Sequence, residues 1–379
     1  MIYLDYNATT PLCAPAREAM LPYLDEHFGN ASSIHQAGRE ARAAIDSARD
    51  TLAHLLGSKS HELIFTAGGT ESDNLGIIGL ARAHAHRGRH LITSVVEHHA
   101  VLHAFQFLES REGFRVTWLP VDPVGRIDLQ RLADSITPET ILVSLMTANN
   151  ETGTTQPAAD AARLCRERGV LFHSDAIQSF GKEEFRAGDF DAFSLAAHKF
   201  YGPKGAGLLY LRAGIPIHQL QVGGSHEGQR RAGTENVAAI AGMAAAARFA
   251  TGDVVAEGQR LDTLRECLWD GVRRVFPSAI RNGTREATLA NTLNVTFPGL
   301  EGESLLMNLD LEGVCASSGS ACMVGSVMPS HVLLAMGVPP ENAKSTVRFS
   351  LGRATSSGQI AQAINALEST VARMRPRLS

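Results

Sequence analysis

Lys199 is the residue whose surroundings point most directly to chemistry. It follows an apolar run at 191–197 and precedes a Gly-Pro turn, and a second apolar run covers 207–211. A lysine at the end of a buried strand, shielded from water, can have its amine pKa lowered enough to condense with a carbonyl. Taken alone, the stretch favours a solvated loop lysine, because lysine is rarely buried. The Schiff-base interpretation depends on the residues that accompany Lys199.

A glycine turn separates an apolar strand pattern from a helical pattern within residues 63–74. Gly68 and Gly69 are followed by Thr70 and acidic residues. Glycines let the backbone approach a ligand closely, and free amides at a helix N-terminus favour a phosphate. By itself the motif is weak evidence, since a Gly-Gly pair also makes an ordinary tight turn.

Three further strand ends carry polar side chains. Asp175 ends an apolar run, where a carboxylate either caps the next turn or pairs with a cation such as a protonated pyridine nitrogen. His98, next to His99, is either structural or stacks on a flat ring and moves protons near neutral pH. Asn149 and Asn150 can donate to a phenolate oxygen or a carboxylate.

Together these strand ends supply a phosphate cradle, a pyridinium partner, a stacking ring, polar donors and an amine. The joint interpretation is pyridoxal 5′-phosphate bound to Lys199 as a Schiff base, with Asp175 keeping the ring protonated as an electron sink.

Such a site requires a fold that brings strand ends together. From about residue 17 to 205, helical patterns alternate with short apolar runs. The alternation predicts an α/β fold with a mostly parallel sheet covered on both faces, whose ligands sit at the carboxyl ends of the strands. The expected strands are 62–66, 90–94, 115–119, 140–146, 170–173, 190–195 and 207–211, and the expected helices include 41–56, 71–84 and 157–168.

The pattern changes in the last third of the chain. A long helical region, 237–275, is followed by a smaller α+β pattern that ends in an amphipathic helix at 357–374. Within that smaller unit, strands or helices are expected at 291–297, 303–309 and 346–351. We expect an N-terminal arm, 1–13, associated with the small domain, a large cofactor-binding domain, 14–251, and a small C-terminal domain, 252–379.

Composition limits the classes of partner. The chain has 379 residues, 44% of them hydrophobic, and a formal net charge of −4 without a Lys/Arg block, which argues against nucleic acid and anionic membranes. The first residues lack a secretory signal pattern, and the Ala-rich stretch 237–250 is typical of a packed helix rather than a membrane span. Five cysteines without Cys-x-x-Cys spacing indicate no metal site and a reducing, cytoplasmic setting.

Over nearly its whole length the sequence resembles the cysteine desulfurases of the NifS/IscS type, in the class V aminotransferase group of pyridoxal-phosphate enzymes with fold type I. The motifs that carry the resemblance are Tyr3–Thr10, Ser32–His35, Phe65–Glu71, Glu97-His98, Asn149–Glu151, His173–Gln178, His198-Lys199, Gly233–Asn236, Ser317–Cys322 and Arg348–Arg353.

The resemblance implies a role for each matching residue. Lys199 would be the Schiff-base lysine, Asp175 would bind the pyridine nitrogen and His98 would stack on the ring. Arg348 would grip the substrate carboxylate. The remaining contacts would come from Asn149 and Gln178 near the phenolic oxygen and the substrate, from Gly69, Thr70 and His198 at the phosphate, and from Thr234 of the other subunit of a homodimer.

Cys322 decides the type of reaction. Its neighbours are small and polar, which suits a loop, and the resemblance implies a nucleophile that takes sulfur from L-cysteine as a persulfide. A small buried cysteine is the alternative, and it is retained for Cys13, Cys165, Cys267 and Cys315.

Three positions depart from the family pattern. Ala196 replaces a frequent serine, which would remove one hydrogen bond to the phosphate, while His226 replaces a glutamine and Gln229 stands where glycine is common.

The implied activity is conversion of L-cysteine to L-alanine. Lys199 would move the Cα proton, Cys322 would attack the substrate sulfur with His98 as proton carrier, and the persulfide would pass to an acceptor such as an iron-sulfur scaffold. The alternatives are a selenocysteine lyase, another class V lyase or aminotransferase, and a non-catalytic platform that recruits sulfur-handling proteins.

Overall fold

The computed structural model describes residues 1–318 and 329–374. Within these ranges the strands form a seven-stranded, a three-stranded and a two-stranded sheet. The large sheet has the order β2-β8-β7-β6-β5-β3-β4. Its strands are β2 (Leu63–Thr66), β3 (His90–Ser94), β4 (Arg115–Leu119), β5 (Thr140–Ser144), β6 (Leu171–Asp175), β7 (Ala192–Ala196) and β8 (Gly207–Leu211).

The predicted α/β fold with a mostly parallel sheet is confirmed. Strands β4, β3, β5, β6 and β7 pair in parallel, and β8 runs antiparallel to both β7 and β2. Every residue of the central strands is buried, as expected for a sheet covered on both faces.

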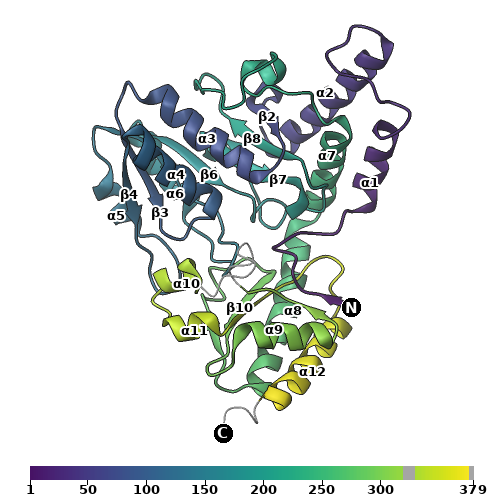
Figure 1. The fold of residues 1–379 in the computed structure, drawn as a ribbon, viewed down its shortest axis with the longest axis vertical. Helices are drawn as coiled ribbons and strands as arrows, with labels where there is room; N and C mark the ends of the chain where they lie inside the picture. Colours follow the sequence, from purple (N-terminus) through teal and green to yellow (C-terminus); the bar gives the residue numbers. More distant parts are fainter. Residues whose placement is uncertain (319–328, 375–379) are drawn as a thin grey trace.

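Helices cover the two faces of the large sheet in separate groups. Buried residues of α3 (Gly69–His84) and α4 (His99–Glu112) pack on one face. The other face is covered by α1 (Ala14–Met20), α2 (Gln36–Leu56), α5 (Leu129–Ser135), α6 (Ala158–Glu167) and α7 (Val237–Thr251). Figure 1 shows this layered part above a smaller unit.

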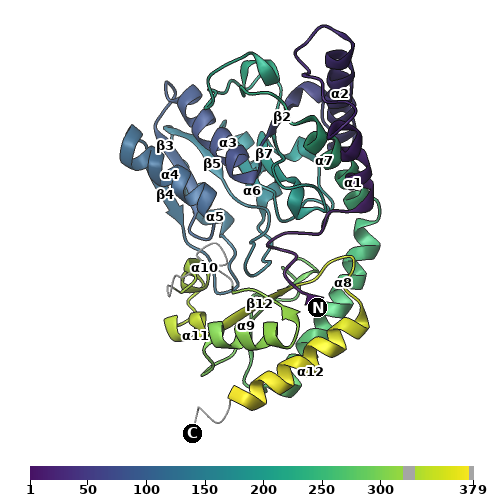
Figure 2. The same ribbon diagram turned by 45° about the vertical axis from the view of Figure 1, so that its right-hand side comes forward.

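The smaller unit has its own hydrophobic core. It contains the sheet β12-β10-β9 and the helices that pack on it, together with Ile2 and Leu4 of the N-terminal segment. Its elements are α8 (Val254–Val275), β9 (Ile280–Asn282), β10 (Thr292–Thr296), α9 (Gly302–Leu311), β11 (Val314–Cys315), α10 (His331–Ala335), α11 (Pro340–Lys344), β12 (Thr346–Ser350) and α12 (Ser357–Met374). Figure 2 shows α8 and α12 side by side along its edge.

Two features support the expected domain division, which stays a prediction. The predicted helical region 237–275 is two helices, α7 and α8, with a 70° bend between them at the expected boundary. At the N-terminus, β1 (Ile2–Tyr3) pairs with β11 of the small unit. Across the described residues no one helix has the length and apolar character to cross a membrane; α7 and α8 meet that test only as a bent pair.

The expected bounds 90–94, 115–119, 207–211 and 357–374 agree with the structure, whereas three strands of the large sheet end elsewhere. One of them, β7, runs to Ala196 rather than to 195. β5 stops at Ser144 rather than at 146, because the Met146 amide donates to the Glu97 carboxylate instead of to a neighbouring strand (3.0 Å). β6 continues to Asp175, which pairs in register with Ser194 of β7.

Gly352 joins the small unit to the N-terminal segment and provides a test of that packing. A Cβ at Gly352 would lie 2.1 Å from the Tyr6 ring, whereas one at Gly358, in the first turn of α12, would meet only Ser356 Oγ at 3.8 Å. We expect Gly352→Ala to destabilise the protein by about 1–3 kcal/mol through overpacking. Gly358→Ala, the matched control, should be neutral or slightly stabilising. Equal urea-unfolding midpoints for the two variants would contradict this packing.

Candidate active site

A cavity of about 350 Å³ lies at the carboxyl ends of β5, β6 and β7, between the two units. Eight predicted site residues line it: Gly69, Thr70, His98, Asp175, Gln178, His198, Lys199 and Arg348. Asn7, Asp73, Asn150 and Glu151 complete much of its polar wall. Residues from both units and from the N-terminal segment thus meet at one cavity.

Lys199 is delivered to this cavity by β7. The strand ends at Ala196, and one short 3₁₀ turn, Ala197–Lys199, carries His198 and Lys199 beyond it. The Lys199 amine donates to the backbone carbonyls of Asn7 (2.7 Å) and Ala8 (2.8 Å). The N-terminal segment therefore fixes where the amine lies.

Asp175, at the end of β6, is buried beside a second buried carboxyl group, Asp73 of α3. Asp175 Oδ1 accepts from the Ile177 amide (2.9 Å), and burial raises the pKa of Asp175 to about 6, although that amide and Lys199 oppose the rise. Neither carboxylate oxygen of Asp73 has a hydrogen-bond partner among the described residues. Burial and then the charge of Asp175 raise the pKa of Asp73 well above its usual value. The pair creates a local demand for a cation or a shared proton.

His98 is the N-cap of α4. Its Nδ1 accepts from the Ala100 amide (3.1 Å), so the proton of the neutral ring sits on Nε2. Burial, with Lys199 as the next cause, lowers the pKa of His98 to about 4. His98 is therefore a neutral imidazole near pH 7.

The N-terminus of α3 faces the cavity through Gly69 and Thr70. No side chain caps this helix at Gly68, which leaves its first amides for an anion. A Cβ at Gly69 would lie 2.3 Å from Ile177 Cδ1, so any larger residue here would displace the end of the Ile177 side chain.

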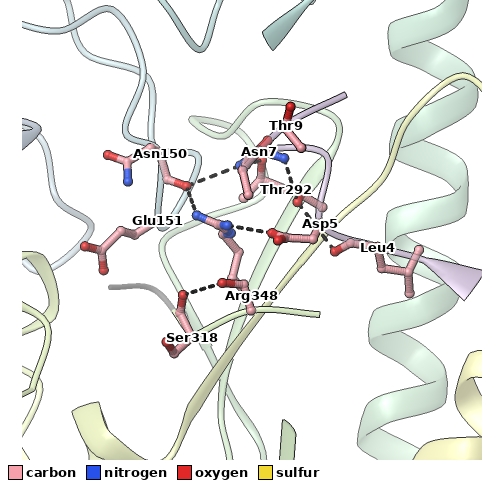
Figure 3. A network of polar contacts seen from close by, with 12 residues as sticks. Leu4, Asp5, Asn7, Thr9, Asn150, Glu151, Thr292, Ser318 and Arg348 are labelled. Carbon is pink, nitrogen blue, oxygen red and sulfur yellow. Dashed lines mark hydrogen bonds and ion pairs between the residues drawn. The ribbon is translucent and has the colours of Figure 1, made fainter. Parts of the chain in front are cut away.

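Arg348 of β12 reaches the cavity from the small unit. Its Nη2 binds Asp5 Oδ1 (2.7 Å) and its Nη1 donates to the Asn150 carbonyl (2.8 Å), as Figure 3 shows. Arg348 Nε has no partner within the described part of the chain. The guanidinium is thus held in place with donor capacity left for a carboxylate.

Three predicted site residues are not on this wall. Asn149 is buried behind it, where its Nδ2 donates to the Val96 carbonyl (2.9 Å) and its Oδ1 accepts from the amides of Glu151 and Thr152. Thr234 is exposed and does not line the cavity. Cys322 lies outside the described residues.

The departures from the family pattern have local contacts. Ala196 lines the cavity with its methyl group. In the 225–233 loop, His226 Nδ1 accepts from the Gly233 amide (3.3 Å), and Glu227 anchors the loop by binding Arg49 (2.6 Å). Gln229 has a φ of 63°, the left-handed region in which glycine is favoured.

Sequence reasoning missed Asn7, Asp73 and Lys182. The only indication for Asn7 in the sequence was its place in the segment Tyr3–Thr10, which matches the family. Asp73 lies one helical turn after Gly69 in α3, beyond the glycine motif that drew attention to this region. Lys182 carried no signal. It is partly buried, and its amine donates to Gln178 Oε1 (2.8 Å).

Comparison with known proteins identifies the family. The model of the aminotransferase class-V family matches residues 2–362. The chain belongs to this family. It is 47% identical to the cysteine desulfurase IscS of Dictyoglomus turgidum and 44% identical to that of Methanosarcina thermophila, each alignment covering 99% of this chain and 95% and 93% of the relatives.

Two solved structures of similar proteins extend the comparison. A NifS-like protein has 35% identity and a TM-score of 0.92, covering 98% of this chain and 99% of that one. SspA in complex with cysteine has 36% identity and a TM-score of 0.81, covering 93% and 99%.

Pyridoxal phosphate is the cofactor of this family, and the cavity fits it. The uncapped α3 N-terminus suits the phosphate and the Asp73–Asp175 pair suits a protonated ring nitrogen, while Lys199 provides the amine. The fit rests on the two Asp73 oxygens, which have no hydrogen-bond partner among the described residues, and on the first amides of α3, which no side chain caps at Gly68.

The Asp175 assignment makes a pH prediction for the cofactor-free protein. With a pKa of about 6, Asp175 is a carboxylate above that pH and is protonated below it. We expect affinity for pyridoxal phosphate to fall about tenfold between pH 7 and pH 5, as the ring nitrogen loses its partner. The measurement is an absorbance titration at each pH.

Asp175→Asn separates this effect from titration of the phosphate. The variant should bind weakly at pH 7 and show a smaller pH step, while Asp160→Asn, on the exposed side of α6, should behave as wild type. Wild-type affinity and an unchanged step in Asp175→Asn would contradict the assignment.

Proposed function

We propose that the protein is a cysteine desulfurase that converts L-cysteine to L-alanine and transfers the sulfur through Cys322. The observation that carries the proposal is the meeting of an amine, a buried carboxylate and an arginine at one cavity: Lys199, Asp175 and Arg348. The 47% identity to a protein named cysteine desulfurase supports the choice of reaction.

Substrate binding is assigned to Arg348. Asp5 and the Asn150 carbonyl hold the guanidinium so that its remaining N–H groups can bind the carboxylate of L-cysteine in two-pronged fashion. Asn149 and Gln178 are proposed to lie near the phenolic oxygen of the cofactor. The phosphate is assigned to Gly69, Thr70 and His198, with Thr234 reaching it from a second subunit.

Proton movement is assigned to Lys199 and His98. When bound, pyridoxal phosphate supplies an electron sink that stabilises negative charge at the substrate Cα. Lys199 Nζ would take the Cα proton and return it, and the Asp175 carboxylate would hold the ring nitrogen in its protonated form. His98 would stack on the ring and act as the proton carrier, with Nε2–H as its donor because Nδ1 accepts from the Ala100 amide.

Sulfur transfer is assigned to Cys322. Its thiolate attacks the substrate Sγ, the Sγ–Cβ bond breaks, and the electron pair goes to the carbon, which takes up a proton to give the methyl group of alanine. Cys322 is oxidised to a persulfide as the carbon is reduced. The persulfide sulfur then passes to an acceptor, for which we propose an iron-sulfur scaffold or another sulfur carrier.

The assembly is proposed to be a cytoplasmic homodimer. Thr234 is exposed on a segment that contacts the region of Ser32 through His226. Exposed large apolar residues occur in the same part of the sequence, at Leu24, Phe28 and Ile34. Free thiols at four described cysteines support a reducing compartment.

The test is product formation from L-cysteine by the cofactor-loaded protein with a thiol reductant. We expect alanine and sulfide in equal amounts, because the reductant releases the persulfide sulfur. Cys322→Ser should make neither product yet still bind cofactor and L-cysteine, and Lys199→Ala should fail in every step after binding.

Cys267→Ser, at an exposed cysteine of α8, is the control and should retain full activity. Alanine production at the wild-type rate by Cys322→Ser would refute the nucleophile assignment. If L-selenocysteine yields alanine and L-cysteine does not, the selenocysteine lyase alternative replaces the proposal.

A further inference from the structure

A second lysine amine lies next to Lys199. Lys182 Nζ donates to Gln178 Oε1 (2.8 Å) and approaches Asn7 Oδ1 (3.4 Å), while Lys199 Nζ donates to the backbone carbonyl of the same Asn7 (2.7 Å). Both lysines also line a small cavity of about 20 Å³ next to the main one. Both amines therefore form hydrogen bonds with the same residue, Asn7.

The chain places Lys182 there through a tight reversal after β6. Gly181 has a φ of 75°, and a Cβ at this position would lie 2.8 Å from the Ala250 Cβ. The Lys182 amide donates to the Ser179 carbonyl (2.9 Å), which folds the side chain back toward Gln178. The backbone turn at Ser179–Lys182 therefore sets the direction in which the Lys182 side chain leaves the chain.

Lys182 also orients Gln178. Because the ammonium occupies Gln178 Oε1, the amide nitrogen must face the other way, and Nε2 donates to the Asn7 carbonyl (3.0 Å). That carbonyl is the one that holds Lys199. A chain of hydrogen bonds therefore connects Lys182 to Gln178, Gln178 to Asn7, and Asn7 to Lys199.

The groups around the two amines carry charges of both signs. In the described part of the chain Lys182 forms no salt bridge, and burial, followed by the charges of Lys199 and Arg348, lowers the pKa of Lys182 to about 7, with Glu183 opposing. The carboxyl groups that face the amines are Asp73, Glu151 and Asp175 in the main cavity, Glu257 in the small cavity, and Glu183 beside Lys182. The other titratable or charged groups are His98, His99, His198 and His331, whose pKa values burial lowers, together with Tyr6, Tyr201, Arg353 and Arg348, which is paired with Asp5.

The charge of Lys199 disfavours the charged form of Lys182. Because electrostatic repulsion is mutual, a charge on Lys182 disfavours the charged form of Lys199 in the same way. When two ionisable groups interact strongly, protonation of one opposes protonation of the other, and the two titrate as a pair. Condensation with a carbonyl requires the uncharged amine, and a neighbouring cation is a known means of favouring it.

We propose that Lys182 is a positioning residue that shares a single proton with Lys199 and so keeps Lys199 uncharged for part of the time at neutral pH. This inference rests on the proposed role of Lys199 as the Schiff-base lysine. It assigns to Lys182 no contact with the reacting atoms.

The test uses cofactor-free full-length protein. The rate of pyridoxal phosphate uptake, followed by the visible absorbance of the bound cofactor, is measured from pH 6 to pH 9.5 for wild type, Lys182→Met, Lys182→Arg and the exposed control Lys204→Met. Thermal unfolding of each variant checks that it is folded.

Lys182→Met should shift the midpoint of the pH–rate curve upward by about one pH unit, and uptake at pH 7 should fall about tenfold. Lys182→Arg keeps a permanent charge and should leave the midpoint at or below the wild-type value. Lys204→Met should match wild type. A wild-type midpoint in Lys182→Met, or an equal upward shift in Lys182→Met and Lys182→Arg, would overturn the proposal.

Lys199→Ala separates this inference from the proposed function. If Lys199→Ala develops the same absorbance as wild type, Lys199 is not the Schiff-base lysine and both proposals fail. If it does not, and Lys182→Met titrates as wild type, only the role of Lys182 is wrong.

Discussion

The position of Asn7 between the two units is the constraint on which the site depends. Its backbone carbonyl accepts from Lys199 and Gln178 of the large unit, while its side chain binds Asn291 (2.9 Å) and Thr292 (2.9 Å) of the small one. Two residues earlier, Asp5 holds Arg348. The N-terminal segment thus sets the distance between the Lys199 amine, for which we propose the chemical role, and Arg348, to which we assign the substrate. A short segment distant in sequence is therefore part of the candidate active site.

The polar groups of the cavity are arranged at a cost in folding free energy. Asp73 and Asp175 are two buried carboxyl groups whose charges oppose each other, and the amines of Lys182 and Lys199 bring two like charges close together. The proton sharing that we propose for the two lysines would lower this cost in the cofactor-free protein. A ligand that carries both a phosphate and a protonated ring offsets it further, so cofactor binding and the stability of this region are linked.

The sequence predicted those features that come from local pattern. The apolar runs predicted the strands of the sheet. The polar and glycine residues at the ends of these runs predicted Lys199, Asp175, His98 and the Gly69 turn as parts of the site. The antiparallel direction of β8 was not predicted, because an apolar run of five residues carries no direction. Lys182 and Asp73 were missed because their importance comes from neighbours distant in sequence. The role of Asn149 stays a prediction: its side chain bonds the Val96 carbonyl and the Glu151 amide, contacts that the sequence pattern does not indicate.

The central claim is that Lys199 carries the cofactor, and the most direct measurement is to find the attachment site. Borohydride reduction of the pyridoxal-phosphate-loaded protein makes the bond permanent, and mass spectrometry of its peptides locates the added mass. We predict a single modified residue, Lys199, in wild type and in Lys182→Met, and none in Lys199→Ala. Attachment to Lys182 or Lys204 in the wild-type protein would contradict the account.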